Sequence, residues 1–379
     1  MSLFYQNFKL GVLGGGQLGR MLIQEAINYN LHVSILDPDE NAPCSELANV
    51  FTQGNLTDYE TVLAFGRKCD LVTIEIENVN TDALKQLASE GTQVFPQPEI
   101  ISLIKNKVDQ KVFYRENNIP TAAFEVISQQ TDLKNTSLSL PFVNKLATEG
   151  YDGRGVQVIR SEADFAKAFD THGLVEEFVD FEKEISVIIA RNQEGKIKVF
   201  PTVELEFHPE QNLVEYLHTP AVIDKEVDAK AKMIAIDIIK KLDMVGLLAI
   251  EMFVTKDGLV LVNEMAPRTH NSGHQTIESS ITSQFDQHLR AILGLPLGNT
   301  TLRSPATMVN LLGEAGFTGP ARYEGLDTVL DMKGVYVHLY GKAITKPFRK
   351  MGHVTIIGKK KKKLAEKAKF VKETLKVKA

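Results

Sequence analysis

The stretch GVLGGGQLGRML, residues 11–22, decides how the chain begins to fold. An apolar run at 9–14 predicts a strand, and the segment from the glycines to residue 30 predicts a helix. Gly14, Gly16 and Gly19 have the G-x-G-x-x-G spacing, and Asp37 ends the next apolar run, HVSILD. Together these features are the fingerprint of a dinucleotide-binding fold. The stretch predicts a Rossmann-like domain and raises the question of a nicotinamide cofactor.

Strand and helix patterns continue to alternate through the first hundred residues. Runs at 48–54, 69–76 and 92–96 predict strands, and runs at 57–68 and 81–91 predict helices. This order predicts a doubly wound parallel sheet. A helix carrying Lys105, Lys107 and Lys111 then begins a different region and stops before Pro120.

The rest of the chain is expected to mix strands and helices without the same rhythm. Predicted strands lie at 121–127, 140–146, 155–160, 173–179, 183–192, 196–207, 246–255 and 258–266, with helices at 225–242 and 283–294. The KDG turn at 256–258 predicts a hairpin. Residues 297–379 predict a small β-rich region with a terminal helix, whose apolar stripe is Leu364, Ala368, Val371 and Leu375.

Composition excludes several classes of protein. The 379 residues are 43% hydrophobic and 24% charged, as in a globular protein of two or three domains. We expect no membrane span, no signal peptide and a cytoplasmic setting, because the apolar runs are short and Cys44 and Cys69 form no C-x-x-C. Residues 359–379 carry about +8 of charge, leaving about −13 elsewhere. A solvated helix is favoured over nucleic-acid binding there, because no aromatic residues alternate with the lysines.

Two motifs indicate a nucleotide and a divalent cation. TEGYDGRG, residues 148–155, is a glycine-rich loop after a strand carrying Lys145, an arrangement that suits phosphate oxygens. An ordinary hairpin loop is the alternative, although a lysine in an apolar strand needs a partner. Glu251 and Glu264 each end an apolar run of the predicted hairpin, beside Asn263. Antiparallel pairing would bring the two carboxylates together, and a magnesium ion that bridges nucleotide phosphates would relieve their repulsion. The alternative is that both glutamates face solvent.

Three further motifs predict anion or substrate contacts. PRTHNSGHQTIESS, residues 267–280, concentrates hydrogen-bonding groups, and Arg268 suits a carboxylate or phosphoryl group. His270 and His274 as a transition-metal site are a weaker alternative, because magnesium-type carboxylates adjoin them. Arg349, Lys350 and His353 lead into a predicted strand and are candidates to bind an anion. Glu75 and Glu77 would point the same way on another predicted strand and are candidates to bind a substrate amine or ribose hydroxyl. A charged surface turn and a solvated sheet edge are the respective alternatives.

With these motifs assembled, the chain resembles the N5-carboxyaminoimidazole ribonucleotide synthetase family, the ATP-grasp ligases of purine biosynthesis. The motifs that carry the resemblance run in order along nearly the whole chain: GVLGGGQLGRM, EIENV, IPT, GYDGRG, EEFVDFEKEISV, NEMAPRTHNSGH, SQFDQHLRAILGLPLG, HLYGK and RKMGH. The resemblance implies a Rossmann-like pre-ATP-grasp domain at 1–104, a two-part ATP-grasp domain at 105–296 with its lid at about 120–180, and a β-rich C-terminal domain at 297–379. In such enzymes the N-terminal domain binds no nicotinamide.

The resemblance also implies roles for residues. The implied ATP contacts are Lys107 (commonly arginine in the family), Lys145, the loop Gly150, Tyr151, Asp152, Gly153, Arg154, Gly155 and Val156 (commonly glutamine), the adenine hinge Glu176, Glu177, Phe178 and Val179, the ribose carboxylate Glu184, His208, Asn263 and Glu264. The implied metal ligands are Glu251 and Glu264, for magnesium or alternatively manganese.

The acceptor side is implied in the same way. The residues for aminoimidazole ribonucleotide are Gly14, Gly15, Gln17, Leu18, Glu75, Tyr151, Asp152, Arg154, Arg349 and Lys350, and those for bicarbonate chemistry are Arg268, His270, Asn271 and Lys350. The implied reaction forms carboxyphosphate from ATP and bicarbonate, and transfers its carboxyl group to the substrate amine. A homodimer is implied too. The alternatives are another ATP-grasp enzyme, such as a formate-dependent glycinamide ribonucleotide transformylase or a biotin carboxylase, a nicotinamide dehydrogenase, and a non-catalytic nucleotide-binding regulator.

Overall fold

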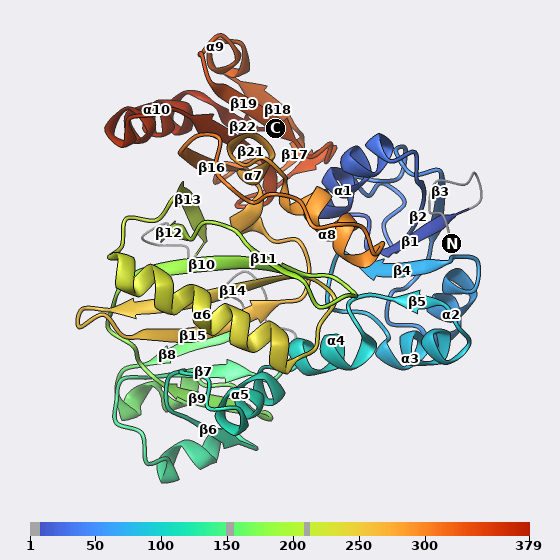
Figure 1. Cartoon of the computed structure of the whole chain (residues 1–379). Helices are drawn as coiled ribbons and strands as arrows, with labels where there is room; N and C mark the ends of the chain where they lie inside the picture. The colour runs from blue at the N-terminus through green and yellow to red at the C-terminus, as the bar shows by residue number, and fades with distance from the viewer. Residues whose placement is uncertain (1–7, 149–154, 208–212) are drawn as a thin grey trace.

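The structure, a computed structural model, describes residues 8–148, 155–207 and 213–379. Three regions follow one another along the chain (Figure 1). The N-terminal region, in blue, stands beside a larger central region in green and yellow, and the C-terminal region in orange and red lies at the top of the view. The domain boundaries given above remain predictions.

The N-terminal region is the predicted doubly wound parallel sheet. Its strands lie in the order β3-β2-β1-β4-β5. They are β1 (Lys9–Leu13), β2 (His32–Asp37), β3 (Val50–Gln53), β4 (Leu71–Ile74) and β5 (Gln93–Val94), connected by α1 (Gln17–Asn28), α2 (Tyr59–Gly66) and α3 (Thr81–Ser89). The order in which the strands are added reverses between the parallel neighbours β1 and β4, so the loops after these strands form the crevice where ligands bind in such sheets.

Two expectations about this region are wrong. β4 ends at Ile74, so Glu75 and Glu77 lie in the bend beyond it rather than on one strand face. The predicted single helix around Lys107 is two helices, α4 (Pro98–Lys105) and α5 (Lys107–Glu116). Asn106 is extended between them, and its side chain caps α5 by accepting the Val108 N–H at 2.9 Å. An asparagine that caps the next turn competes with continuing the helix.

The central region contains two sheets. The lid sheet has the order β6-β9-β7-β8 and is antiparallel. Its strands are β6 (Phe124–Ile127), β7 (Phe142–Leu146), β8 (Val156–Ile159) and β9 (Gly173–Glu177). Single 3-10 turns at 130–135 and 162–167 lie between these strands. Helix α5 packs on β9 and so connects the lid sheet to the rest of the molecule.

The large antiparallel sheet has the order β15-β14-β10-β12-β13-β16-β21-β19, with β11 also on β10. Its strands are β10 (Phe181–Arg191), β11 (Ile197–Val199), β12 (Val203–Phe207), β13 (Val214–Thr219), β14 (Gly246–Thr255), β15 (Val260–Ala266), β16 (Ala306–Leu312), β19 (Val335–Leu339) and β21 (Lys350–Ile357). The single strand predicted at 196–207 is interrupted near Pro201, which has no N–H to donate to a neighbour. Helix α6 (Lys225–Lys241) lies across this sheet (Figure 1) and buries Ile234 and Ile238 in the largest core cluster.

The C-terminal region continues the large sheet, because β16 pairs with β13 of the central region. Helix α10 (Lys361–Thr374) covers this end of the sheet. Its predicted stripe is confirmed, since Leu364, Ala368, Val371 and Leu375 are all buried. The smaller elements here are β17 (Gly319–Pro320), β18 (Arg322–Glu324), α9 (Leu326–Leu330), β20 (Ile344–Thr345) and β22 (Lys376–Lys378). Helices α7 (Thr276–Ser279) and α8 (Gln284–Ile292) precede this region in the chain. Within the described ranges, no helix has both the length and the apolarity that crossing a membrane requires.

Replacing Leu364 by alanine tests how α10 is attached. The side chain is 4% exposed within the C-terminal core cluster. We expect the free energy of unfolding of this region to fall by about 2–4 kcal/mol, from lost burial and a residual cavity. Urea unfolding followed by far-UV circular dichroism measures the loss. Lys362→Ala, an exposed change on the same helix, is the control, and equal stability of the two variants would contradict the packing described.

Candidate active site

Two carboxylates lie side by side at the centre of the candidate site. β14 and β15 form the predicted hairpin, and their register places Glu251 directly opposite Glu264. Neighbouring residues in such a pair have Cβ atoms only about 5 Å apart. The predicted side-by-side placement of these two carboxylates is therefore confirmed.

The carboxylates at this site have very different proton affinities. The charge of Lys107 lowers the pKa of Glu264 to about 2. Burial, reinforced by the charges of Glu184 and Glu264, raises the pKa of Glu251 well above its ordinary value. Burial and the charge of Glu264 raise the pKa of Glu184, on the adjacent strand β10, to about 7. Burial and mutual repulsion thus disfavour ionising all three carboxylates at once, and a bound cation would relieve that cost.

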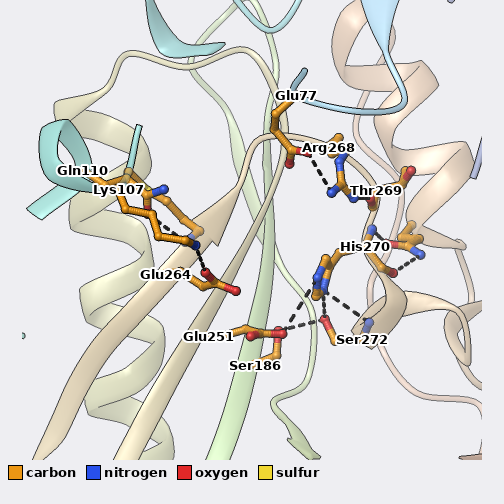
Figure 2. Close-up of polar contacts among 12 residues, drawn as sticks. Glu77, Lys107, Gln110, Ser186, Glu251, Glu264, Arg268, Thr269, His270 and Ser272 are labelled. Carbon is orange, nitrogen blue, oxygen red and sulfur yellow. Dashed lines mark hydrogen bonds and ion pairs between the residues drawn. The ribbon is translucent and has the colours of Figure 1, made fainter. Parts of the chain in front are cut away.

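Lysines from α5 and the lid sheet face these carboxylates. The Lys107 Nζ lies 2.7 Å from Glu264 Oε2 (Figure 2). Lys145, on β7, donates to Asn263 Oδ1 at 3.0 Å and lies 3.0 Å from Glu176 Oε2. The expectation that Lys145 needs a partner is confirmed. A small pocket between the two sheets is lined by Lys107, Gln110, Lys111, Lys145, Glu176, Asn263 and Glu264.

The loop after β15 brings Arg268 and His270 to the other side of the carboxylate pair (Figure 2). Arg268 forms an ion pair with Glu77 Oε2 at 2.9 Å and donates to the Thr269 carbonyl at 3.0 Å. The His270 Nε2 lies 3.8 Å from Glu251 Oε1, and its Nδ1 lies 3.0 Å from Ser272 Oγ. The pair with Glu77 joins this loop to the N-terminal region.

Buried hydrogen bonds hold this loop rigid. The Gln284 amide accepts from the His270 N–H at 2.9 Å and donates to the His270 carbonyl at 2.8 Å. The Ser272 hydroxyl lies 2.8 Å from that of Ser186 on β10. The buried Asn271 Oδ1 has no hydrogen-bond partner among the described residues. A buried acceptor without a partner is costly, so a donor from a ligand would stabilise it.

In the glycine loop after β1, acidic side chains already accept backbone N–H groups that a dinucleotide would need. Asp37 Oδ2 accepts the Gly15 N–H at 2.6 Å, and Glu75 Oε1 accepts the Leu18 N–H at 3.1 Å. Gly14 has φ +105°, and a Cβ on Gly16 would lie 2.5 Å from Glu75 Oε1. Two carboxylates therefore use N–H groups that would otherwise bind a pyrophosphate. Burial raises the pKa of Glu75 to about 7, so it is no solvated edge residue.

The prediction that His353 binds an anion is wrong. Its side chain is fully buried and stacks on His338 at 4.4 Å between ring centroids, and the tilted ring of His274 lies at 4.9 Å. Burial lowers the pKa of both His274 and His353 well below the ordinary value, so both are neutral. Arg349 donates to the Ile344 carbonyl at 2.6 Å. Lys350 begins β21, and its charge lowers the pKa of Glu251, against the larger effect of burial.

The sequence did not assign every residue of the site. Lys111 was placed on the predicted helix but given no role in the site, although its position one helical turn after Lys107 was a usable signal. The ion pair of Glu77 with Arg268 was not predicted. Gly155 and Val156 lie at the start of β8, and Glu176 and Glu177 end β9. The loop residues Gly150, Tyr151, Asp152, Gly153 and Arg154, and also His208, lie outside the described residues.

Comparison with known proteins agrees with this geometry. Three family models match in order: a ribonucleotide synthetase preATP-grasp domain over 8–105, an ATP-grasp domain over 112–285, and a phosphoribosylaminoimidazole carboxylase C-terminal domain over 306–367. The chain is 37% identical over 363 residues to N5-carboxyaminoimidazole ribonucleotide synthase of Bacillus subtilis, covering 94% of this chain and 93% of that one. This chain belongs to the N5-carboxyaminoimidazole ribonucleotide synthase family. The predicted family and the ATP-grasp fold are confirmed.

Two further members frame the comparison. The synthase of Aspergillus clavatus, solved with ADP and 5-aminoimidazole ribonucleotide, superimposes with a TM-score of 0.88 at 32% identity, over 97% of this chain and 98% of that one. Phosphoribosylaminoimidazole carboxylase, chloroplastic, of Vigna aconitifolia is 38% identical over 360 residues. That match takes in 92% of this chain and 64% of the plant protein, so the chain spans about two thirds of this longer relative.

The buried histidines should withdraw stability in mild acid, against an opposite contribution from Glu75 and Glu184, whose raised pKa of about 7 lets the folded state bind protons first. In the folded state the pKa of His274 and His353 lies below the ordinary value of 6.5, so below that pH the unfolded chain binds more protons. The histidine contribution to stability is full above pH about 6.5 and is lost as pH falls, by up to about 1.4 kcal/mol per pH unit for each histidine. Urea midpoints between pH 7.5 and 5 measure this.

His353→Phe keeps a ring in the stack and removes one proton site. We expect the stability of this variant, relative to wild type at the same pH, to improve as pH falls from 7.5 to 5, because one acid-linked loss has been removed. The control is His172→Ala, an exposed histidine in the lid sheet region. A His353→Phe variant with the wild-type slope would show that this imidazole does not drive the loss.

Proposed function

We propose that the chain is an ATP-dependent ligase that carboxylates the 5-amino group of 5-aminoimidazole ribonucleotide, giving N5-carboxyaminoimidazole ribonucleotide, ADP and phosphate. The observation that carries this is the in-register pair Glu251 and Glu264, with lysines on one side and the Arg268–His270 loop on the other. The lysine side suits a nucleoside triphosphate, and the side with the Arg268–His270 loop suits an anionic acceptor.

The nucleotide lies between the lid sheet and the large sheet in this proposal. Lys107 and Lys145 neutralise its phosphates, and Glu184 faces its ribose. The loop 150–156 closes over it, His208 adds a contact, and the segment 176–179 holds the adenine. Water is kept from the reacting atoms by that closure, because carboxyphosphate hydrolyses readily.

The residues present also fit a magnesium ion. Among the residues that the structure describes, no group of three or more His, Cys, Asp or Glu side chains is arranged to hold a metal by itself. Magnesium commonly takes one or two carboxylates and completes its shell with phosphate oxygens and water. Glu251 and Glu264, with Asn263 adjacent, would hold it, with manganese as the substitute. When bound, the ion would neutralise phosphate charge.

The acceptor side performs the carboxyl transfer. Arg268, His270, Asn271 and Lys350 hold bicarbonate, whose oxygen attacks the γ-phosphorus to form carboxyphosphate and ADP. Arg268 is the charged donor that stabilises the developing negative charge.

The ribonucleotide lies against the glycine loop in this proposal. Gly14, Gly15, Gln17, Leu18 and Glu75 face it from the N-terminal region, Arg349 and Lys350 from the C-terminal region, and Tyr151, Asp152 and Arg154 from the loop. Its 5-amino group captures the carboxyl group, from carboxyphosphate or from the carbon dioxide it releases. A homodimer in the cytoplasm, bound to neither nucleic acid nor membrane, completes the proposal.

The decisive experiment is ADP release from MgATP with bicarbonate, in the presence and absence of 5-aminoimidazole ribonucleotide. We expect strong stimulation by the ribonucleotide. Glycinamide ribonucleotide with formate runs in parallel, because a transformylase of the same fold would respond to that pair instead. A response only to the glycinamide pair, or to neither, would overturn the proposed substrate.

Arg268→Ala tests the acceptor side. We expect kcat to fall by about 10²–10³-fold, the scale for removing a charged oxyanion donor. The control is Arg67→Ala, which removes an exposed guanidinium that pairs with Glu90 and belongs to none of the proposed site residues. This variant should leave kcat unchanged. Steady-state ADP release measures both variants. A near wild-type kcat in Arg268→Ala would refute its role.

A further inference from the structure

A second buried lysine, Lys111, lies behind the nucleotide pocket. It follows Lys107 by one turn of α5, and its side chain is 3% exposed. Its ammonium lies 3.2 Å from Glu176 Oε1 and donates to Thr121 Oγ1 at 2.5 Å. A lysine is rarely buried without a paired charge, and burial lowers the pKa of this one to about 8. The position therefore has a cost that a leucine would not have.

Thr121 anchors this lysine to the strand that carries the metal-side residues. Its hydroxyl donates to the Val262 carbonyl at 2.6 Å, and the Val262 N–H donates to the Pro120 carbonyl at 2.8 Å. Val262 directly precedes Asn263 on β15. The ammonium of Lys111 is thus fixed relative to the large sheet.

Glu176 is shared between two lysines. Its side chain is 4% exposed, with Oε1 toward Lys111 and Oε2 at 3.0 Å from Lys145. Lys145 also donates to Asn263 Oδ1 at 3.0 Å. Glu176 therefore uses one oxygen for each lysine, and its carboxylate is committed to them rather than to a nucleotide base.

The charge of this triad explains why two lysines are present. Two ammonium groups and one carboxylate leave one net positive charge, and Lys145 is the member that reaches Asn263 beside the carboxylate pair. Without Lys111, Glu176 would pair with Lys145 alone and the triad would be neutral. The attraction of the pocket for phosphate would then weaken, because an ammonium fully paired with a buried carboxylate has little charge to offer.

We infer that Lys111 is a positioning residue, which engages one oxygen of Glu176 and so leaves Lys145 charged and oriented toward the nucleotide phosphates. This inference rests on the proposed function, because it requires that the pocket bind a nucleotide. It assigns Lys111 no contact with the adenine or the ribose. Its effect should therefore depend on the number of phosphates.

The test compares the binding of ATP, ADP and adenosine, which differ only in the number of phosphates. Lys111→Met keeps the length of the side chain and removes its charge. Isothermal titration calorimetry with magnesium would measure Kd for ATP and ADP, with adenosine measured by competition. We expect ATP and ADP to bind about 10- to 100-fold more weakly, the range for a lost charge-assisted interaction, and adenosine to bind within twofold of wild type. Lys111→Arg, which keeps the charge, should restore most of the ATP affinity.

Two comparisons separate positioning from general damage. Lys232→Met breaks a half-exposed pair with Asp228 on α6 and should leave all three affinities unchanged. In a double-mutant cycle with Lys145→Met, the loss from Lys111→Met should nearly vanish, because Lys111 acts through Lys145. If Lys111→Met does not fold, Thr121→Val, which releases the ammonium without removing it, should show the same phosphate-selective loss with a smaller size.

The outcomes that overturn the inference are distinct from those that overturn the proposed function. Unchanged ADP binding in Lys111→Met, an equal loss for adenosine, or full additivity with Lys145→Met would overturn the positioning role alone. Failure of the wild-type protein to bind any adenine nucleotide would overturn the proposed function, and the inference with it.

Discussion

The opposition of Glu251 and Glu264 across the β14–β15 hairpin is the constraint on which the rest of the site depends. Two carboxylates at neighbouring positions of one sheet repel, and Glu184 on the next strand adds a third acidic group. The surrounding chain responds with cations from separate elements, Lys107 from α5 and Lys145 from β7. The site is thus organised around negative charge on a rigid sheet, and the positive groups come from parts of the chain that pack onto it.

The second organising feature is that the acceptor side and the nucleotide side of the site are built from different parts of the chain. The Arg268 guanidinium meets Glu77, which follows β4 of the N-terminal region, and Lys350 begins a strand of the C-terminal region. Gln284 fixes the backbone between them through both hydrogen bonds to His270. The acceptor side is therefore assembled from long-range contacts, whereas the nucleotide side is assembled between two adjacent sheets.

The sequence predicted those parts of the molecule that depend on local pattern. Alternation and the KDG turn were sufficient for the hairpin and its carboxylate register, and four apolar positions were sufficient for the buried face of α10. Features that depend on tertiary surroundings could not be read. Asn106 lies within an apparently continuous helical pattern, and only its capping geometry shows the break.

Charged and aromatic side chains were the least predictable. His353 lies in a basic segment that looks exposed, yet its neighbours in space are two other imidazoles from distant positions. The same limit applies to the glycine fingerprint. The spacing of its glycines gives the loop shape, but the partners of its N–H groups are Asp37 and Glu75, and only the fold brings Glu75 there.

The pairing of β13 with β16 carries the large sheet across the boundary between the ATP-grasp and C-terminal regions. A protein cut at that boundary would lose the strand that covers β13 and would expose a row of unpaired backbone N–H and C=O groups. Such an edge is a template for pairing with another chain, so the two regions are inseparable in practice and a shortened version would tend to aggregate. The continuous sheet also couples these two regions, because turning one against the other would break the hydrogen bonds between β13 and β16.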